Sequence, residues 1–289
     1  MKQIIHTLLL VAMMPLLHAC SGNAGRGSNT IMVTIEPIRY FTEQIAGDKF
    51  TVVSMVPSGS SPETYDPTPR QLTSLSESRA YLRIGYIGFE QTWMERLTEN
   101  APRMEVFNLS QGVSLIQEAE HHHDHHAHQG GVEPHIWNSP TNARIIVQNI
   151  YQALCELDAP NSDYYATNLQ RVIGEIEETD HTIRHLLTQP HDSTFLIYHP
   201  ALSYYARDYQ LRQVCLEENG KEPSVAHLKE LITRCKAEQV RTIFVQQEFD
   251  SRNAELIAGE TGARLVTINP LSYEWRKELI ETTKALCHE

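Results

Sequence analysis

Three side chains of metal-binding type stand near the ends of predicted elements in this 289-residue chain. Glu63 and His199 each come after a β-branched run, and His135 lies just before a predicted pair of helices. In open parallel sheets, ligands bind beyond the carboxyl ends of the strands, so these side chains can meet in one place. One carboxylate and two imidazoles suit zinc, and manganese or iron stays admissible if further oxygen atoms join. The residues therefore predict a site for a divalent transition metal.

A second concentration of imidazole lies between residues 118 and 129, beside Glu118, Glu120 and Asp124. Six of the fifteen histidines of the chain fall there: His121, His122, His123, His125, His126 and His128. Adjacent imidazoles cannot all point at one ion from a regular element, so we expect a flexible loop that gathers several ions weakly. The alternative is a solvated loop without a metal role. Deleting residues 120–128 is expected to leave a tight site intact.

The elements that must position these groups alternate between strand and helix. In the first half, strands are predicted at 31–35, 51–56, 80–84 and 104–107, with helices near 38–46, 69–77 and 89–99. In the second half, strands are predicted at 194–198, 211–216, 242–246 and 264–268, with helices near 202–209, 225–238, 251–259 and 274–287. This alternation predicts an α/β protein of two small lobes, each with a parallel sheet covered on both faces.

Two amphipathic segments are predicted to join the lobes. The first, 140–157, opens with Ser139 as a helix cap. The second, 162–188, carries apolar residues at helical spacing: Leu169, Val172, Ile173, Ile176, Ile183, Leu186 and Leu187. At ~1.5 Å per residue it would be roughly 40 Å long, a rigid strut that limits hinge opening. We therefore expect an N-terminal lobe at 30–139, joining helices at 140–189, a C-terminal lobe at 190–289 and a metal site at the lobe interface.

The N-terminus is typical of an exported protein. Lys2, an apolar run over 8–17 and Ala19 before Cys20 predict a secretory signal at 1–19, too short to span a membrane. The sequence Leu-His-Ala-Cys resembles a bacterial lipobox, so Cys20 is the predicted site of lipidation; the alternative is a cysteine that merely lies near a cleavage site. Residues 20–29 then form a flexible tether. We expect the mature chain in the periplasm or at the cell surface, lipid-anchored to a membrane.

Charge and cysteine content narrow the class further. With 24 Lys and Arg against 36 Asp and Glu, the net charge of −12 argues against a nucleic-acid partner and is compatible with attracting cations. The four later cysteines, Cys155, Cys215, Cys235 and Cys287, show no spacing of a structural zinc site. They are expected to be small core residues or to form one or two disulfides, whose pairing the sequence leaves open.

Over essentially its whole mature length, the chain resembles the substrate-binding proteins of zinc and manganese ABC importers. The matching motifs are 57–69, Pro134-His135-Ile136-Trp137, Tyr198-His199-Pro200-Ala201 with Tyr204, Gly220-Lys221-Glu222-Pro223-Ser224 and Ile243-Phe244-Val245. The internal histidine loop is also found in the zinc-type members. The resemblance implies that His135 and His199 are metal ligands and that Glu63 stands where relatives usually have a third histidine.

The resemblance leaves the fourth ligand open. Gln246 stands where the family often has Glu, and Glu248, two residues on, is a replacement donor. Many members use Asp where this chain has Asn269, a poorer donor. Glu248, Asn269 or water thus remain for the fourth position, with Gln246 as a weaker candidate. Because the first and fourth donors depart from the family pattern, zinc, manganese and iron all stay chemically admissible.

The function implied by the resemblance is capture of one metal ion, zinc first, and its delivery to an importer permease with its ATPase by a monomeric, non-enzymatic receptor. Affinity for the metal should fall as pH drops through the histidine range. One alternative is a metal buffer or chaperone that acts through the histidine loop. The other is a zinc hydrolase, but the sequence has no His-Glu-x-x-His helix, Gly-x-Ser-x-Gly elbow or nucleotide-binding Gly-x4-Gly-Lys loop.

Overall fold

The computed structural model of the chain describes residues 29–117, 131–218 and 220–288. The predicted signal segment, Cys20, all but the last residue of the tether and the six histidines of the loop lie outside these ranges. No helix within the described ranges is long and apolar enough to cross a membrane.

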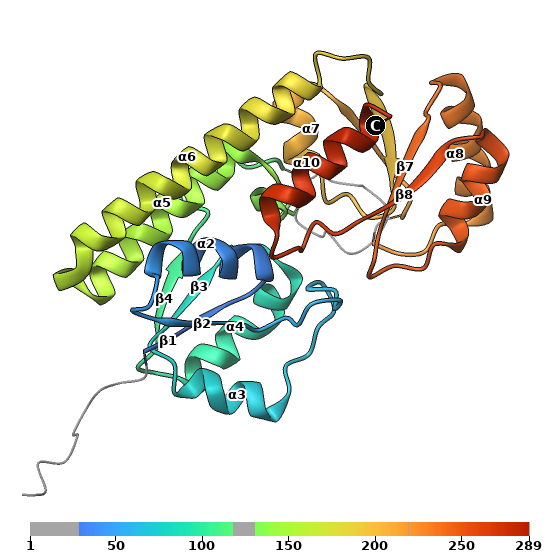
Figure 1. The fold of residues 1–289 in the computed structure, drawn as a ribbon. Helices are drawn as coiled ribbons and strands as arrows, with labels where there is room; N and C mark the ends of the chain where they lie inside the picture. The colour runs from blue at the N-terminus through green and yellow to red at the C-terminus, as the bar shows by residue number, and fades with distance from the viewer. Residues whose placement is uncertain (1–28, 118–130, 219, 289) are drawn as a thin grey trace, which may run out of the picture.

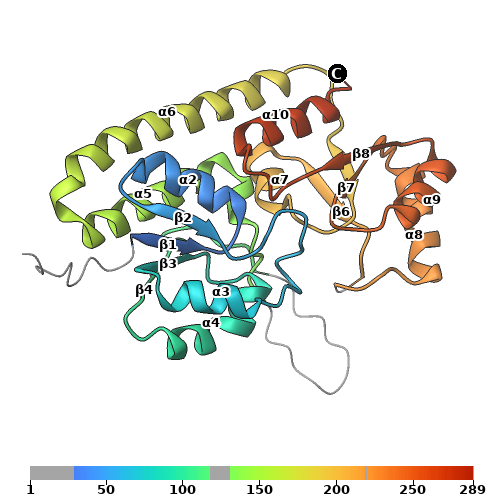
Figure 2. The same cartoon turned by 60° about the horizontal axis from the view of Figure 1, so that its bottom comes forward.

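The N-terminal lobe is built on a four-stranded sheet in the order β2-β1-β3-β4, with every neighbouring pair parallel. Its strands are β1 (Thr30–Val33), β2 (Thr51–Ser54), β3 (Ala80–Arg83) and β4 (Glu105–Asn108). Its helices are α2 (Glu36–Ala46), α3 (Pro69–Ser76) and α4 (Gly88–Asn100). Helix α2 covers one face of the sheet, and α3 and α4 lie on the other (Figures 1 and 2). The predicted helix start at Pro69 is confirmed by a capping box between Thr68 and Gln71.

The C-terminal lobe repeats this arrangement with the order β6-β5-β7-β8, again parallel throughout. Its strands are β5 (Thr194–Ile197), β6 (Arg212–Cys215), β7 (Thr242–Gln246) and β8 (Arg264–Ile268). Its helices are α7 (Ser203–Tyr209), α8 (Val225–Ala237), α9 (Arg252–Thr261) and α10 (Trp275–Leu286). Helices α8 and α9 lie on the outer face, and α7 and α10 lie toward the rest of the molecule (Figure 1). The prediction of two parallel α/β lobes is confirmed.

The lobes are joined by α5 (Pro140–Leu157) and the 25-residue α6 (Ser162–Leu186). A 3-10 turn, η1 (Ile136–Asn138), precedes α5, and a second, η2 (Ala159–Asn161), separates the two helices. The hydroxyl of Ser139 accepts a hydrogen bond from the backbone N–H of Asn142 at 3.1 Å and caps α5 as expected. Figure 1 shows α6 running along both lobes, and it contacts α2 in the first and α10 in the second.

The joining helices belong to a core shared by both lobes. One hydrophobic cluster extends from the N-terminal sheet through α5 and α6 to the inner face of the second sheet, whereas a separate cluster lies beneath α8 and α9. Helix α2 also meets the C-terminal lobe directly, since the rings of Phe41 and Trp275 lie 5.0 Å apart and those of Tyr40 and Tyr273 lie 5.4 Å apart. A continuous core of this kind resists independent rotation of the lobes.

The cysteines contribute packing. Among the described residues, Cys155, Cys215 and Cys235 form no disulfide. The thiol of Cys287 donates to the backbone carbonyl of Leu186 at 3.5 Å.

Candidate metal centre

A pocket lies between the lobes, beyond the carboxyl ends of the strands. Its walls come from the loop after β2, from the segment before η1 and from the loops that follow β5, β7 and β8. The lining residues are Ser61, Pro62, Glu63, His135, Trp137, His199, Ala201, Gln246, Glu248, Phe249, Pro270 and Leu271. The pocket therefore forms where the alternation of strands and helices predicted that ligands would bind.

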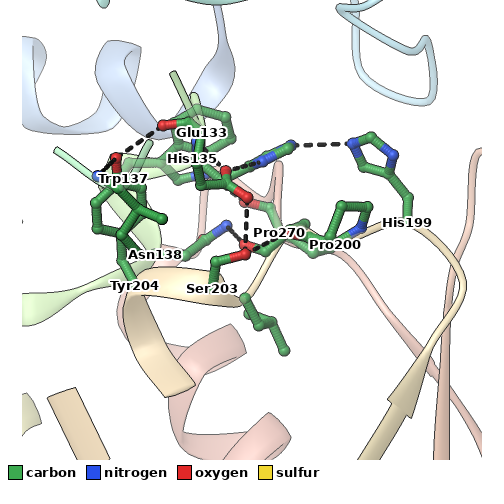
Figure 3. Close-up of polar contacts among 12 residues, drawn as sticks. Glu133, His135, Trp137, Asn138, His199, Pro200, Ser203, Tyr204 and Pro270 are labelled. Carbon is green, nitrogen blue, oxygen red and sulfur yellow. Dashed lines mark hydrogen bonds and ion pairs between the residues drawn. The ribbon is translucent and has the colours of Figure 1, made fainter. Parts of the chain in front are cut away.

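Glu63, His135 and His199 converge in this pocket. Each offers one ligand atom, and the three atoms lie within 4.8 Å of one another. The Nε2 atoms of the two imidazoles are 3.2 Å apart, and the rings point toward each other in Figure 3. Two nitrogens bound at about 2.0 to 2.1 Å to one tetrahedral zinc ion lie about 3.3 Å apart, so the spacing already matches an edge of a zinc tetrahedron.

His135 is held from behind by a buried carboxylate. Its Nδ1 lies 2.5 Å from Oε1 of Glu133, and the same oxygen accepts the backbone N–H of His135 at 2.8 Å. The other carboxylate oxygen accepts a hydrogen bond from the hydroxyl of Ser203 at 2.7 Å (Figure 3). The Tyr204 hydroxyl donates to the backbone carbonyl of Glu133 at 2.8 Å. The C-terminal lobe thus fixes the orientation of a ligand that precedes the joining helices.

The charges of this pair are coupled. Burial lowers the pKa of His135, but the negative charge and hydrogen bonding of Glu133, aided by Glu63 and Glu217, outweigh it and leave that pKa above its usual value. Burial likewise raises the pKa of Glu133, and the charge and hydrogen bonds of His135 reverse the effect and leave it below its usual value. The Glu133 carboxylate is therefore kept ionised beside the imidazole.

His199 is held in the same way. Its Nδ1 lies 3.0 Å from Oε1 of Glu217, which follows β6. The ring of Phe249 stacks on the imidazole with centroids 5.4 Å apart. The side chain of Gln246 brackets the backbone of His199, accepting from its N–H at 3.3 Å and donating to its carbonyl at 2.6 Å. Ring and backbone of this ligand are both fixed.

The two carboxylates decide what can lie between the imidazoles. A carboxylate beside Nδ1 requires the proton on Nδ1, so in each neutral ring Nε2 carries a lone pair. Two lone pairs 3.2 Å apart repel each other unless a cation lies between them. A zinc ion or a proton on one ring removes this repulsion, so the arrangement is built to attract a cation.

Glu63 approaches from the N-terminal lobe. Its Oε2 accepts the backbone N–H of Gly88, the first residue of α4, at 3.0 Å. Its Oε1 is buried and has no hydrogen-bond partner among the described residues. An unpartnered buried carboxylate oxygen is costly in the absence of a cation.

The three candidates for a fourth ligand differ in their surroundings. Glu248 lines the pocket, its Oε1 is buried without a hydrogen-bond partner in the described part of the chain, and burial raises its pKa. Gln246 also lines the pocket, but both polar atoms of its side chain bond to the His199 backbone. Asn269 is not among the lining residues, and its Oδ1 accepts the backbone N–H of Leu271 at 3.2 Å. Of these three candidates, Glu248 alone has a pocket-lining oxygen without a hydrogen-bond partner among the described residues.

Sequence reasoning missed Glu133 and Glu217. Glu217 follows the predicted strand 211–216, so the rule that located the other polar groups, applied to this strand as well, leads to it. Glu133 lies only two residues before His135, but nothing in its spacing shows that its carboxylate turns back to the ring. A metal-bound histidine usually donates its other ring N–H to a carboxylate or carbonyl, and this rule is the signal for both residues.

Comparison with known proteins shows similarity to proteins of zinc uptake. The family described as "Zinc-uptake complex component A periplasmic" matches residues 31–282. The high-affinity zinc uptake system protein ZnuA of Bacillus subtilis is 29% identical over 279 residues, 91% of this chain and 87% of that protein. The zinc-binding lipoprotein AdcA of Streptococcus pneumoniae is 26% identical over 286 residues, 94% of this chain and 56% of AdcA.

Solved structures give the same result. A crystal structure of ZnuA aligns with a TM-score of 0.84 and 34% identity, covering 90% of this chain and 98% of that one. A zinc-bound deletion mutant of ZnuA aligns with a TM-score of 0.81 and the same 34% identity, covering 90% of this chain and 97% of that one. Fold and pocket define the class of two-lobed substrate-binding proteins of metal importers. Within that class, the chain belongs to the family of zinc-uptake complex component A proteins.

Proposed function

We propose that this protein binds one zinc ion between its lobes, outside the cytoplasm, and delivers it to the permease of an ABC importer. The observation that carries the proposal is the pair of imidazole Nε2 atoms 3.2 Å apart, each ring with a carboxylate at its other nitrogen and a third donor from Glu63 within 4.8 Å. Such a centre needs a cation to be electrostatically balanced. The relatives described as zinc-uptake and zinc-binding proteins support zinc as that cation.

In this proposal Glu63, His135 and His199 are ligands, and Glu248 or water completes the coordination sphere. Glu248 is the preferred protein ligand for the fourth position because its buried Oε1 at the pocket has no hydrogen-bond partner among the described residues. Gln246 and Asn269 are ranked below it because their side chains hold backbone groups. With one or two carboxylates, the donor set is chemically harder than one made of histidines alone. Manganese and iron are therefore the competing metals to test.

Two further parts of the proposal concern residues that the structure does not describe. Cys20 would carry the lipid that anchors the chain to a membrane, as the description of AdcA as a lipoprotein supports. The histidine loop would gather several metal ions weakly. Its described flanks, Gln117 and Val132, pair as an isolated antiparallel bridge, and Val132 directly precedes Glu133. We propose that the chain acts as a monomer and catalyses no reaction.

Metal analysis of the mature chain purified without added metal, followed by calorimetry with zinc and manganese, tests the proposal. We expect one tightly bound zinc per chain, displaced poorly by manganese and retained when residues 120–128 are deleted. Several weakly bound ions and no tight one would indicate a buffer that works through the loop. Tight zinc binding that survives Glu63→Ala, His135→Ala and His199→Ala together would contradict the ligand assignment.

A further inference from the structure

The loop that carries Glu63 docks onto the N-terminus of α4. The backbone N–H of Gly88 donates to Oε2 of Glu63 at 3.0 Å, and the N–H of Phe89 donates to the carbonyl of Pro62 at 2.9 Å. Ile87, at the N-cap position of α4, makes no side-chain capping hydrogen bond. The first N–H groups of a helix have no partner within the helix, so this loop supplies acceptors that the local sequence lacks.

Because of this contact, the two carboxylate oxygens of Glu63 have different roles. Oε2 is committed to Gly88, while Oε1 is buried and has no hydrogen-bond partner in the described part of the chain. The positive end of the helix stabilises the negative charge of the Glu63 carboxylate beside it. The carboxylate is thus held without a proton-donating side chain that would neutralise Oε1. Oε1 is thus the oxygen left for a cation.

The close approach depends on the absence of a side chain at position 88. A Cβ added to Gly88 would lie 2.6 Å from Oε2 of Glu63, 2.8 Å from its carbonyl oxygen and 3.0 Å from its Cα. Two of these three atoms are backbone, so turning the Glu63 side chain away cannot relieve the crowding. Any larger residue at this position must push the loop, and the ligand with it, away from the imidazoles.

We propose that Gly88 is a positioning residue for metal binding: the N-terminus of α4 grips Oε2 of Glu63 and presents Oε1 to the metal. The inference rests on the proposed function, because it assigns a role to a ligand of that same site. It also explains why a carboxylate suits this position better than an imidazole does. An imidazole bound to metal through one nitrogen carries a proton on the other, so it cannot accept the Gly88 N–H.

A double-mutant cycle on the full mature chain tests the proposal, with zinc affinity measured by competition with a chromogenic chelator. We expect Gly88→Ala to weaken zinc binding about 10- to 100-fold, the range found for residues that orient metal ligands. In the Glu63→Ala background the same substitution should cost less than about twofold, because the residue through which it acts is gone. Gly259→Ala is the matched control, since a Cβ there meets nothing within 4 Å, and it should leave the affinity unchanged.

Amide hydrogen exchange in the metal-free protein tests the contact without altering Gly88. In Glu63→Ala, exchange at the Gly88 amide should accelerate at least about tenfold, whereas Phe89, whose acceptor is the Pro62 backbone, should change less. Unchanged Gly88 exchange, or an equal loss from Gly88→Ala with and without Glu63, would overturn the inference. If Glu63→Ala itself leaves zinc affinity intact, the ligand assignment fails; if Glu63→Ala weakens binding but Gly88→Ala does not, only the role of Gly88 fails.

Discussion

On one side of the metal centre, two imidazoles each donate a hydrogen bond to a carboxylate; on the other, a carboxylate accepts a hydrogen bond from the N-terminus of a helix. His135 and His199 are backed by Glu133 and Glu217, whereas Glu63 is backed by the N–H of Gly88. The difference follows from ligand chemistry, because a metal-bound imidazole has a donor to satisfy and a metal-bound carboxylate has an acceptor. The surroundings of each ligand are matched to its type, so ligands and supports should not be exchangeable.

The largest effect is expected on the histidine side. His135→Ala or His199→Ala removes a ligand and the imidazole that its supporting carboxylate contacts, so zinc affinity should fall by more than about 100-fold, beyond the usual contribution of supporting residues. Competition titration against a chelator measures the loss. Retention of near-native affinity by either variant would show that the imidazoles do not hold the metal.

The supports of the histidines come next. Glu133→Ala should weaken zinc binding about 10- to 100-fold, and Glu133→Gln should lose less because its amide oxygen still accepts the His135 N–H. The same substitution at the exposed Glu222 is the control. Equal losses from Glu133→Ala and Glu133→Gln would mean that the charge matters and the orientation of the ring does not.

Replacing the carboxylate ligand Glu63 with an imidazole should also reduce zinc affinity, but by less than the substitutions above. Glu63→His provides a good zinc ligand, yet its second ring nitrogen must carry a proton that faces the Gly88 N–H. We expect zinc affinity about tenfold below that of the unmodified chain, measured by the same competition assay. Tighter zinc binding by Glu63→His would show that the surroundings of this ligand are not matched to a carboxylate.

The smallest effect concerns pH. Glu133 keeps the pKa of His135 above its usual value, so protons should begin to displace zinc at a higher pH than a free imidazole would allow. Removing that charge with Glu133→Gln lowers the pKa of His135, so the pH below which zinc affinity falls from its alkaline plateau should move to lower pH, whatever the affinity at the plateau. Zinc affinity measured with a chelating dye from about pH 8 to about pH 5, the range in which histidine titrates, gives this pH. An onset of the affinity loss that moves to higher pH would contradict the assignment.

Much of the fold could be predicted from periodicity, because each β-branched run and each amphipathic stretch carries its own local signal. All eight predicted strands appear within a few residues of their expected positions, and Thr68 and Ser139 begin helices as expected. The order of strands within each sheet needed the structure, since pairing between strands leaves no such local mark.

In the metal centre, too, some features have a local sequence signal and others do not. The candidate ligands stand at the ends of recognisable elements, so their types and places could be read from the chain. Glu133 and Gly88 could not, because their roles depend on a side chain that folds back on its neighbour and on a helix N-terminus 25 residues from Glu63 along the chain. Gln246 looked like a weak donor, but the structure uses it to fix the backbone of His199.

A crystal structure of the mature chain with zinc, with data collected at the zinc absorption edge, tests the ligand assignment most directly. We expect one anomalous peak between the lobes, about 2.0 to 2.2 Å from Nε2 of His135, Nε2 of His199 and Oε1 of Glu63. Glu133, Glu217 and Gly88 should keep their contacts behind the ligands. A peak at another place would contradict the ligand assignment. So would a peak too far from Glu63 to be coordinated by it while Glu63 still accepts the Gly88 N–H.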